Sequence, residues 1–324
     1  MKILVVRFSS IGDIVLTTPV VQALKEADEN REIHYLTKDI YTSLIDNNPF
    51  IDQVHSISKD LNEVIDELRI QEFDLIVDLH NNLRTRSLKL KLKRPVRTFK
   101  KLNVAKWLLV NFKMNKLPDV HIVDRYLDSV RDLINTKPTR GSFSIAKENV
   151  INTQERFGFG ERMFITVAVG AKFGTKQIPV NKLKEILDDL NQPIVLLGGK
   201  EDHEKGEEIC AKVNGNLINL CGELNLQQSA SIVSQSKVLL SSDTGLMHIA
   251  ACFDVPIVSV WGNTVPELGM YPYRPEEPSS YSIHEVKDLS CRPCSKIGYQ
   301  ECPKKHFNCM QKQNSEIIRK ELIK

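Results

Sequence analysis

The sequence predicts an α/β protein made of two parallel sheets with helices between their strands. Three observations support this fold class. Short β-rich runs alternate with helical patterns in both halves of the chain. One of these runs, FDLIVDL at 73–79, is apolar almost throughout, which is typical of a parallel strand buried on both faces. The length of 324 residues is about twice that of a typical domain of roughly 100–200 residues.

The first half of the chain contains a βαβα alternation that ends near residue 135. The expected strands and helices follow from apolar runs of period two and of period 3.6, respectively. We expect strands at Lys2–Phe8, Ile33–Leu36, Gln53–Ile57 and Phe73–Leu79, and helices at Ile14–Ala27 and Leu61–Arg69. The segment 135–160 interrupts this rhythm with prolines, glycines and polar residues, and we place the domain boundary there, after residue 155.

The second half restarts the alternation and ends in an irregular segment. We expect strands at Phe164–Val169, Pro193–Leu197, Lys237–Leu240 and Val255–Val260, and helices at Asn181–Leu190, Asp202–Val213, Leu226–Ser234 and Thr244–Cys252. Beyond Trp261 the chain is rich in proline, tyrosine and cysteine until a last helical run at Asn314–Ile323. The predicted organisation is a domain at 1–155, a domain at 156–311 with a Cys-rich loop at 284–311, and a C-terminal helix at 312–324 that packs back on the first domain. Two such domains in series would leave a cleft for two substrates.

The net charge of +3 hides an uneven distribution. Residues 81–118 contain 12 lysines and arginines and no acidic residue, so the rest of the chain carries 3 − 12 = −9. A solvated helix face is one interpretation, but the absence of acidic residues favours an anionic partner such as a membrane surface, a phosphorylated glycolipid or a nucleic acid. No apolar run is long enough to span a bilayer and no export signal is present, so we expect a cytoplasmic protein.

Three motifs follow predicted strands and are candidates for chemistry. After the first strand, Ser9-Ser10-Ile11-Gly12-Asp13 combines small residues with a carboxylate, although an aspartate there also serves as a helix cap worth about 1 kcal/mol. After the strand at 164–169, GAKFGTK at 170–176 offers glycines and lysines that suit a phosphate-bearing ligand. After the strand at 237–240, SSDTGLMH at 241–248 runs into a helix whose N–H groups favour an anion. Neither a dinucleotide fingerprint nor a P-loop is present.

Together, the three motifs in this order resemble glycosyltransferase family 9, the bacterial heptosyltransferases of lipopolysaccharide core assembly. The matching segments are SSIGDIVLTTPVVQAL at 9–24, DLHNNLRTRSL at 78–88, GAKFGTKQIP at 170–179 and SSDTGLMHIAA at 241–251. The resemblance implies a GT-B architecture of two Rossmann-like domains facing a central cleft. It also implies inverting transfer of heptose from ADP-heptose to an inner-core sugar, with no cofactor required.

The resemblance assigns roles by position. It implies that Asp13 is the general base and that Lys176 holds the donor phosphates. The donor side is expected to comprise Ser9, Gly12, Gly170, Lys172, Gln227, Asp243, Thr244, Gly245 and His248, and the acceptor side Ser10, Arg84 and Arg86. Gln227 stands where the family often has a glutamate that holds the donor ribose, which leaves the base and sugar of the donor open. The implied acceptor is an anionic glycolipid, Kdo-lipid A or a heptosylated core, reached by peripheral contact with the inner membrane.

The Cys-rich loop contains four cysteines with partly metal-like spacing. Only the first pair of Cys291, Cys294, Cys302 and Cys309 has the x2 gap of a zinc ligand pair, so we do not assign a metal site, and reduced thiols or a redox-sensitive loop are favoured over structural zinc. Three rival functions stay open: a family relative with another nucleotide-sugar, a nucleotide-sugar epimerase of similar fold, and a basic nucleic-acid-binding protein with a zinc module. The last gives no role to Asp13, and we expect no nucleic-acid partner.

Overall fold

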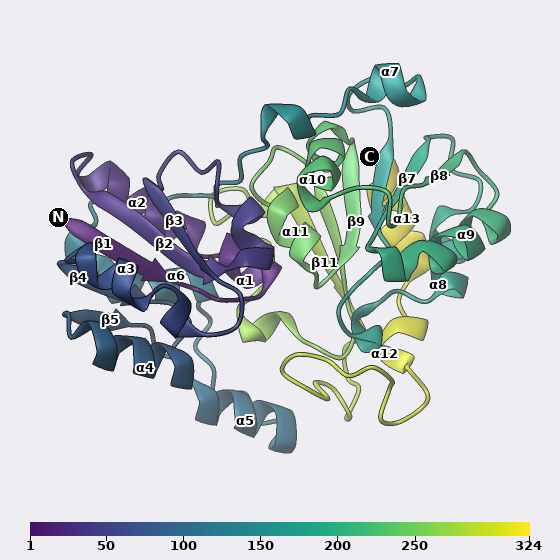
Figure 1. The fold of residues 1–324 in the computed structure, drawn as a ribbon. Coiled ribbons are helices and arrows are strands. Elements are labelled where there is room, and N and C mark those ends of the chain that lie inside the picture. The colour runs from purple at the N-terminus through teal and green to yellow at the C-terminus, as the bar shows by residue number, and fades with distance from the viewer. The chain divides into compact units, whose positions relative to one another are not determined.

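The chain forms two compact units, each built on one parallel sheet (Figure 1). The structure, a computed structural model, describes residues 1–324. The first unit contains residues 1–101 and 120–144, and the second contains residues 102–119 and 145–324. Where one boundary after residue 155 is expected, the chain therefore passes between the units after residues 101, 119 and 144. No helix combines the length and the apolar composition that crossing a membrane requires.

The sheet of the first unit has five parallel strands in the order β3-β2-β1-β4-β5. Because the chain starts at the centre, adds strands on one side and then returns to the other, the strand order reverses between β1 and β4. The strands are β1 (Lys2–Val6), β2 (Glu32–Lys38), β3 (Gln53–Ile57), β4 (Leu75–Asp78) and β5 (Val96–Thr98), and the helices are α1 (Ile11–Val15), α2 (Thr18–Ala27), α3 (Ile65–Ile70), α4 (Leu83–Leu92) and α6 (Ile122–Leu127).

The helix expected at 14–27 is broken into α1 and α2. Pro19 lies in the first turn of α2, where its missing N–H needs no partner. A proline at this point cannot continue the hydrogen bonds of a preceding helix, because it has no N–H to donate. The break keeps α1 short, so that Asp13 lies in the first turn of a five-residue helix directly after β1.

The sheet of the second unit has six parallel strands in the order β11-β10-β9-β6-β7-β8, and its order reverses between β6 and β9. The strands are β6 (Ile165–Ala168), β7 (Ile194–Leu197), β8 (Leu217–Asn219), β9 (Val238–Ser242), β10 (Ile257–Trp261) and β11 (Tyr281–Glu285). The helices are α5 (Asn103–Phe112), α7 (Thr153–Phe157), α8 (Val180–Leu187), α9 (His203–Lys212), α10 (Leu226–Gln235), α11 (Gly245–Ala250), α12 (Asn308–Gln311) and α13 (Ser315–Ile323).

The last helix, α13, packs in the core of the second unit. Ile318 and Leu322 are fully buried in the same apolar cluster as the strands β6, β7 and β9. Lys237, at the start of β9, also donates to the carbonyl oxygen of Ile323 at 3.0 Å. The apolar stripe of this helix thus completes the core of the second unit, and the expected packing on the first domain stays a prediction.

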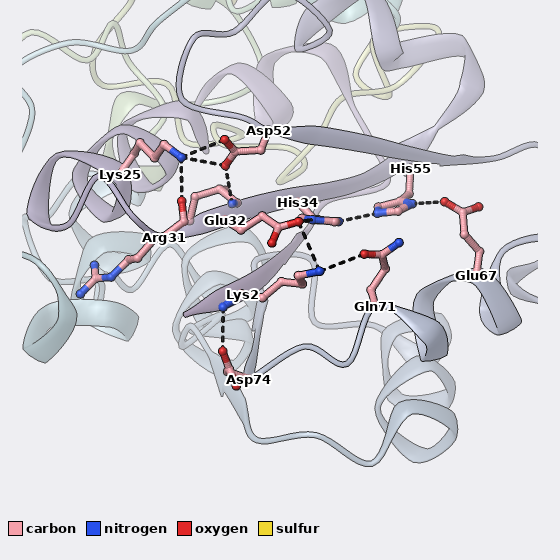
Figure 2. Close-up of polar contacts among 11 residues, drawn as sticks. Lys2, Lys25, Arg31, Glu32, His34, Asp52, His55, Glu67, Gln71 and Asp74 are labelled. Atoms are coloured by element: carbon pink, nitrogen blue, oxygen red, sulfur yellow. Dashed lines mark hydrogen bonds and ion pairs between the residues drawn. The ribbon is translucent and has the colours of Figure 1, made fainter.

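A chain of side-chain contacts joins β2, β3 and α3 at the edge of the first sheet (Figure 2). His34 Nδ1 and His55 Nε2 lie 2.8 Å apart. The outer ring nitrogens of the two imidazoles contact Glu32 at 2.8 Å and Glu67 at 2.6 Å. Both rings are buried and pack edge-on against Phe73. Burial lowers the pKa of His55 from its ordinary value, while its contact with Glu67 acts in the opposite direction.

Candidate active site

Asp13 is held by a buried arginine and by the start of its own helix. Arg7 Nη2 lies 2.6 Å from Asp13 Oδ1, and Asp13 Oδ2 accepts from the backbone N–H of Ser10 at 3.2 Å and from its hydroxyl at 2.8 Å. Arg7 is itself fixed by the carbonyl oxygens of Leu79 and Ser9. Asp13 thus closes the capping box of α1 and at the same time pairs with a cation.

An open pocket of about 440 Å³ lies at the reversal point of the first sheet. Parallel sheets of this kind bind ligands outside the carboxyl ends of the strands at such a point. The lining residues follow the ends of β1, β2 and β4 and begin α4; they are Phe8, Ser9, Lys38, His80, Asn82, Leu83 and Arg84. The guanidinium of Arg84 lies 5.5 Å from the centre of the Phe8 ring. With Lys38 and Arg84 as its charged residues, the pocket suits an anionic ligand.

His80 contributes a neutral imidazole to this pocket. Its Nδ1 accepts from the backbone N–H of Phe8 at 3.3 Å, so the ring proton lies on Nε2. Burial lowers the pKa of His80 to about 4, and the positive charges of Arg7 and Lys101 act in the same direction. The side chain can therefore donate a hydrogen bond to a ligand at neutral pH without adding charge.

The buried His80 predicts a pH-dependent stability. The unfolded chain binds a proton at this ring near pH 6.5 and the folded chain only near pH 4, so the ring's contribution is complete above about pH 6.5 and is lost as the pH falls toward 4. His80→Asn, which keeps an acceptor for the Phe8 N–H, should flatten the stability profile between pH 4.5 and 6.5 in urea unfolding. A profile as steep as that of the wild-type chain would contradict this assignment.

The basic stretch is partly neutralised by acidic residues from elsewhere in the first unit. Lys89 contacts the fully buried Asp78 at 2.6 Å, Arg94 contacts Glu72 at 3.8 Å, and Arg97 forms an ion pair with Asp132. The free positive charge of the stretch 81–118 is therefore smaller than its count of lysines and arginines suggests. Of the two arginines expected on the acceptor side, Arg84 lines the pocket, while Arg86 is exposed on α4 and does not line it.

In the second unit, three strand ends bring a cation, a carboxylate and a hydroxyl together. Lys176 follows β6, Asp243 follows β9 and Thr264 follows β10. Lys176 Nζ donates to Asp243 Oδ2 at 2.6 Å, and Thr264 Oγ1 donates to the same oxygen at 2.9 Å. The side chains of Lys176 and Asp243 are 16% and 11% exposed, so this pair is only partly screened by water. The cluster lies at the reversal point between β6 and β9, where ligands of such sheets bind.

The motif at 241–248 forms the end of β9 and the start of α11. Thr244 caps the helix, since its hydroxyl accepts from the N–H of Met247 at 3.4 Å, and Gly245 is the first helical residue. The same hydroxyl lies 3.0 Å from that of Ser241. His248 is buried in this helix. The structure therefore places Asp243, Thr244 and Gly245 at one strand–helix junction, as the sequence predicts.

The loop that carries Lys176 is anchored by Lys205 of α9. Lys205 Nζ donates to the carbonyl oxygens of Val169 and Ile178 at 3.4 and 3.0 Å and to the side chain of Gln177 at 3.1 Å. Its three protons thus tie together the two ends of the loop. A Cβ at Gly170 would lie 1.8 Å from the carboxylate of Asp202, so a larger residue here would have to displace this buried side chain. Lys172 lies over the ring of Phe173.

The Cys-rich segment is attached to the same loops. The hydroxyl of Thr175 donates to the carbonyl oxygen of Tyr299 at 2.8 Å, and Arg292 donates to the carbonyl oxygens of Gly262 and Thr264. This long irregular segment therefore supports the loops around Lys176 and Thr264. It is stabilised by these contacts, which the sequence does not reveal.

All seven cysteines are free thiols. Cys291 Sγ lies 3.9 Å from His306 Nε2, but no three histidine, cysteine or acidic side chains are grouped so that they could hold a metal ion. Burial raises the pKa of Cys294 to about 11 and that of Cys309 to about 12, which favours protonated thiols. The first cysteine pair has the spacing of a zinc-ligand pair, but the four cysteines of this loop do not form a four-ligand site in this structure.

Comparison with known proteins decides the family. The model of "Glycosyltransferase family 9 (heptosyltransferase)" matches residues 62–302, about three quarters of the chain. The chain belongs to glycosyltransferase family 9. It is therefore a glycosyltransferase, and the predicted fold class of two parallel-sheet α/β units is confirmed.

Relatives of this family 9 chain carry heptosyltransferase names. "Lipopolysaccharide heptosyltransferase 2" of Salmonella typhimurium is 36% identical over 116 residues, so the match spans 33% of each protein. "Lipopolysaccharide heptosyltransferase 1" of Campylobacter coli is 23% identical over 82% of this chain and 84% of its own length. The solved structure of E. coli ADP-heptose lps heptosyltransferase II has a TM-score of 0.71 at 20% identity and covers 99% of both chains. At this identity the last similarity concerns the fold.

Two residues of this family 9 enzyme have surroundings that the sequence does not predict. Gln227 is buried, and its Oε1 already accepts from the backbone N–H of Ala146 at 2.8 Å and from the side chain of Asn149 at 3.1 Å. Asn263, which follows β10 beside Thr264, is 2% exposed, and neither of its amide atoms has a hydrogen-bond partner. The segment after Trp261 lacks periodicity, so only the general rule that ligands bind at strand ends would have identified Asn263.

Proposed function

We propose that this family 9 glycosyltransferase transfers heptose from ADP-heptose to the inner core of lipopolysaccharide with inversion of the anomeric carbon. The observation that carries the proposal is the partly buried cluster of Lys176, Asp243 and Thr264 at the strand ends of one sheet. The names of the relatives, which act on lipopolysaccharide, and the ADP-heptose in the name of the solved structure support this donor and this pathway.

On the donor side, Lys176 and the start of α11 would meet the diphosphate. When the bond between the anomeric carbon and the phosphate oxygen breaks, its electron pair stays on ADP, and negative charge grows on the diphosphate. Lys176 would stabilise that charge, with the N–H groups at Thr244 and Gly245 as further donors. Asp243 forms an ion pair with Lys176 at 2.6 Å, so the incoming phosphates would compete with a carboxylate for the ammonium.

On the acceptor side, Asp13 would act as general base. A hydroxyl oxygen of the acceptor attacks the anomeric carbon from the face opposite ADP, while its proton passes to the carboxylate. The hydrogen bonds from Ser10 and the ion pair with Arg7 fix the orientation of this carboxylate. A single displacement of this kind inverts the anomeric carbon, and it needs one carboxylate base rather than the pair that a double displacement uses.

The acceptor of this reaction is proposed to be an anionic glycolipid. The pocket at the ends of β1, β2 and β4 offers the charges of Lys38 and Arg84 and a neutral hydrogen-bond donor in His80. A Kdo carboxylate or a phosphate on the core would find complementary charge there. Because such an acceptor is embedded in lipid, we place the enzyme at the cytoplasmic face of the inner membrane, in peripheral contact with it.

A transfer assay with ADP-heptose and two acceptors, one ending in Kdo and one in heptose, tests the proposal. Release of ADP together with a product heavier by one heptose, with one of the two acceptors, is the expected result. ADP release that needs no acceptor would instead indicate hydrolysis, and turnover of the donor into an isomer would indicate an epimerase. No reaction with either acceptor would overturn the proposed substrates while leaving the family assignment intact.

A second candidate is a family 9 enzyme with another nucleotide-sugar donor, and Gln227 favours it. The resemblance assigns this position to the donor ribose, but the amide oxygen is engaged by Ala146 and Asn149. A screen of ADP-, GDP- and UDP-sugars with the same acceptors separates the two candidates. Product with a UDP- or GDP-sugar and none with ADP-heptose would support the second.

A further inference from the structure

Helix α5 has one buried face and one exposed apolar face. Leu109 packs against Val265 and Leu268 of the same unit and is 6% exposed. On the other side, Val104 and Trp107, one helical turn apart, are 74% and 55% exposed. At the end of the helix, Phe112 is 58% exposed and its ring contacts that of Trp107, with the centres 5.2 Å apart. Large side chains gathered in this way on a surface indicate an interaction site.

The charge around this face is positive. No acidic residue occurs between 81 and 118. Lys113 and Lys116 are exposed and form no ion pair with a carboxylate, and Lys113 donates only to the carbonyl oxygens of Val110 and Pro293. Lys89, Arg94 and Arg97, in contrast, are all neutralised by acidic residues. The unneutralised charge of the basic stretch thus includes the two lysines that directly follow the exposed apolar residues.

We propose that α5 is the element by which the enzyme docks on an anionic lipid bilayer. The helix would lie in the plane of the interface, with Val104, Trp107 and Phe112 at the level of the lipid headgroups and upper acyl chains. Lysines beside such a face attract the negative surface potential of anionic lipids, and tryptophan prefers this boundary because its ring is apolar and its N–H is polar. Charge complementarity selects an anionic bilayer over a second copy of the chain, whose own α5 would present the same positive charge.

This docking rests on the proposed function in one respect: an acceptor carried by a lipid would explain why the enzyme binds a bilayer. Binding to vesicles that contain no acceptor is independent of transfer. A chain that binds vesicles but fails to transfer heptose would argue against the proposed substrates alone, and one that transfers to a soluble acceptor but ignores vesicles would argue against α5 docking alone.

The intrinsic fluorescence of the chain reports directly on this helix. There are two tryptophans, and Trp261 is 1% exposed, so a change of environment on docking reports Trp107. Vesicles of phosphatidylethanolamine with phosphatidylglycerol should shift the emission to shorter wavelength, and brominated lipids should quench it. Vesicles of phosphatidylcholine should do neither to a comparable extent. An unchanged spectrum together with no co-sedimentation on the anionic vesicles would overturn the proposal.

Substitutions in and beside α5 test which residues contact the bilayer, and a control variant distinguishes a loss of binding from a loss of folding. Lys116→Gln should weaken partitioning about fivefold, the effect of one lysine near an anionic surface, and the double variant Val104→Ser/Phe112→Ser should weaken it more while keeping the Trp107 reporter. Val150→Ser, which removes a 60% exposed aliphatic side chain elsewhere in the unit, is the matched control and should bind as the wild-type chain does. Equal binding by the double variant would overturn the proposal. So would a lipid-free dimer that this variant dissociates, because the face would then join two copies.

Discussion

Replacing Asp13 by asparagine is expected to lower the rate of transfer about 10²–10⁴-fold while ADP binds nearly as well as to the wild-type enzyme. Asparagine has the same shape and can still accept the hydrogen bonds from Ser10, but it cannot take the proton of the acceptor hydroxyl. The loss should therefore appear in kcat, with little change in the KM for the donor. Single-turnover transfer and calorimetric titration with ADP measure the two effects separately.

The Asp13 variant also leaves the buried guanidinium of Arg7 without its partner at 2.6 Å, so its thermal stability must be measured alongside. Asp132→Asn is the control, because it removes an ion pair with Arg97 from the same unit at an exposed position. It should lower neither the rate nor the stability appreciably. Transfer by folded Asp13→Asn at a rate within about threefold of the wild-type rate would remove Asp13 as the base, since a general base contributes far more than that.

Replacing Lys176 by alanine is expected to reduce kcat/KM for the donor about 10²–10³-fold. Unlike the Asp13 substitution, it should weaken both the binding of ADP and the chemical step, because the ammonium would meet a phosphate charge that is present in the donor and increases in the transition state. Asp243 would in addition lose its cation and face the diphosphate as an unneutralised carboxylate. Calorimetry with ADP and steady-state kinetics with the donor check the two components.

Lys184→Met provides the comparison for Lys176, since it removes a lysine from an exposed ion pair with Asp188 in the same unit. It should leave both ADP affinity and rate unchanged. Loss of ADP affinity in Lys176→Ala without any decrease in kcat would assign the lysine to binding alone. An unchanged affinity and rate would place the diphosphate elsewhere.

The site residues that could be predicted from the sequence lie mostly at the ends of strands. Apolar runs located eight of the eleven strands closely enough that Asp13, Lys176 and Asp243 could each be placed after one. In a parallel sheet the carboxyl ends share one edge, so residues that follow different strands come together, such as Lys176 and Asp243, which lie 67 residues apart in the sequence. Sequence spacing gives no information about the partner atoms, and the ion pair between these two side chains was not predicted.

The remaining features depend on contacts between distant segments. No strand or helix was predicted in the stretch 81–118, although it contains β5, α4 and α5, because lysines at its surface positions obscure the apolar periodicity. The acidic partners of this stretch lie outside it, at Asp78, Glu72 and Asp132. The packing of the last helix in the second unit was not predicted for a related reason: an apolar stripe indicates that a helix packs, but not on which sheet.

In the proposed reaction, the contacts of Asp13 affect how readily water can hydrolyse the donor. Both carboxylate oxygens are engaged, one by Arg7 and one by Ser10. As the base that we propose, this carboxylate would activate a stray water molecule poorly, because water brings little binding energy with which to displace the Ser10 hydroxyl. An acceptor sugar anchored through its charged groups brings much more. The same contacts that orient the carboxylate would thus protect an activated sugar from wasteful hydrolysis until the correct alcohol has arrived.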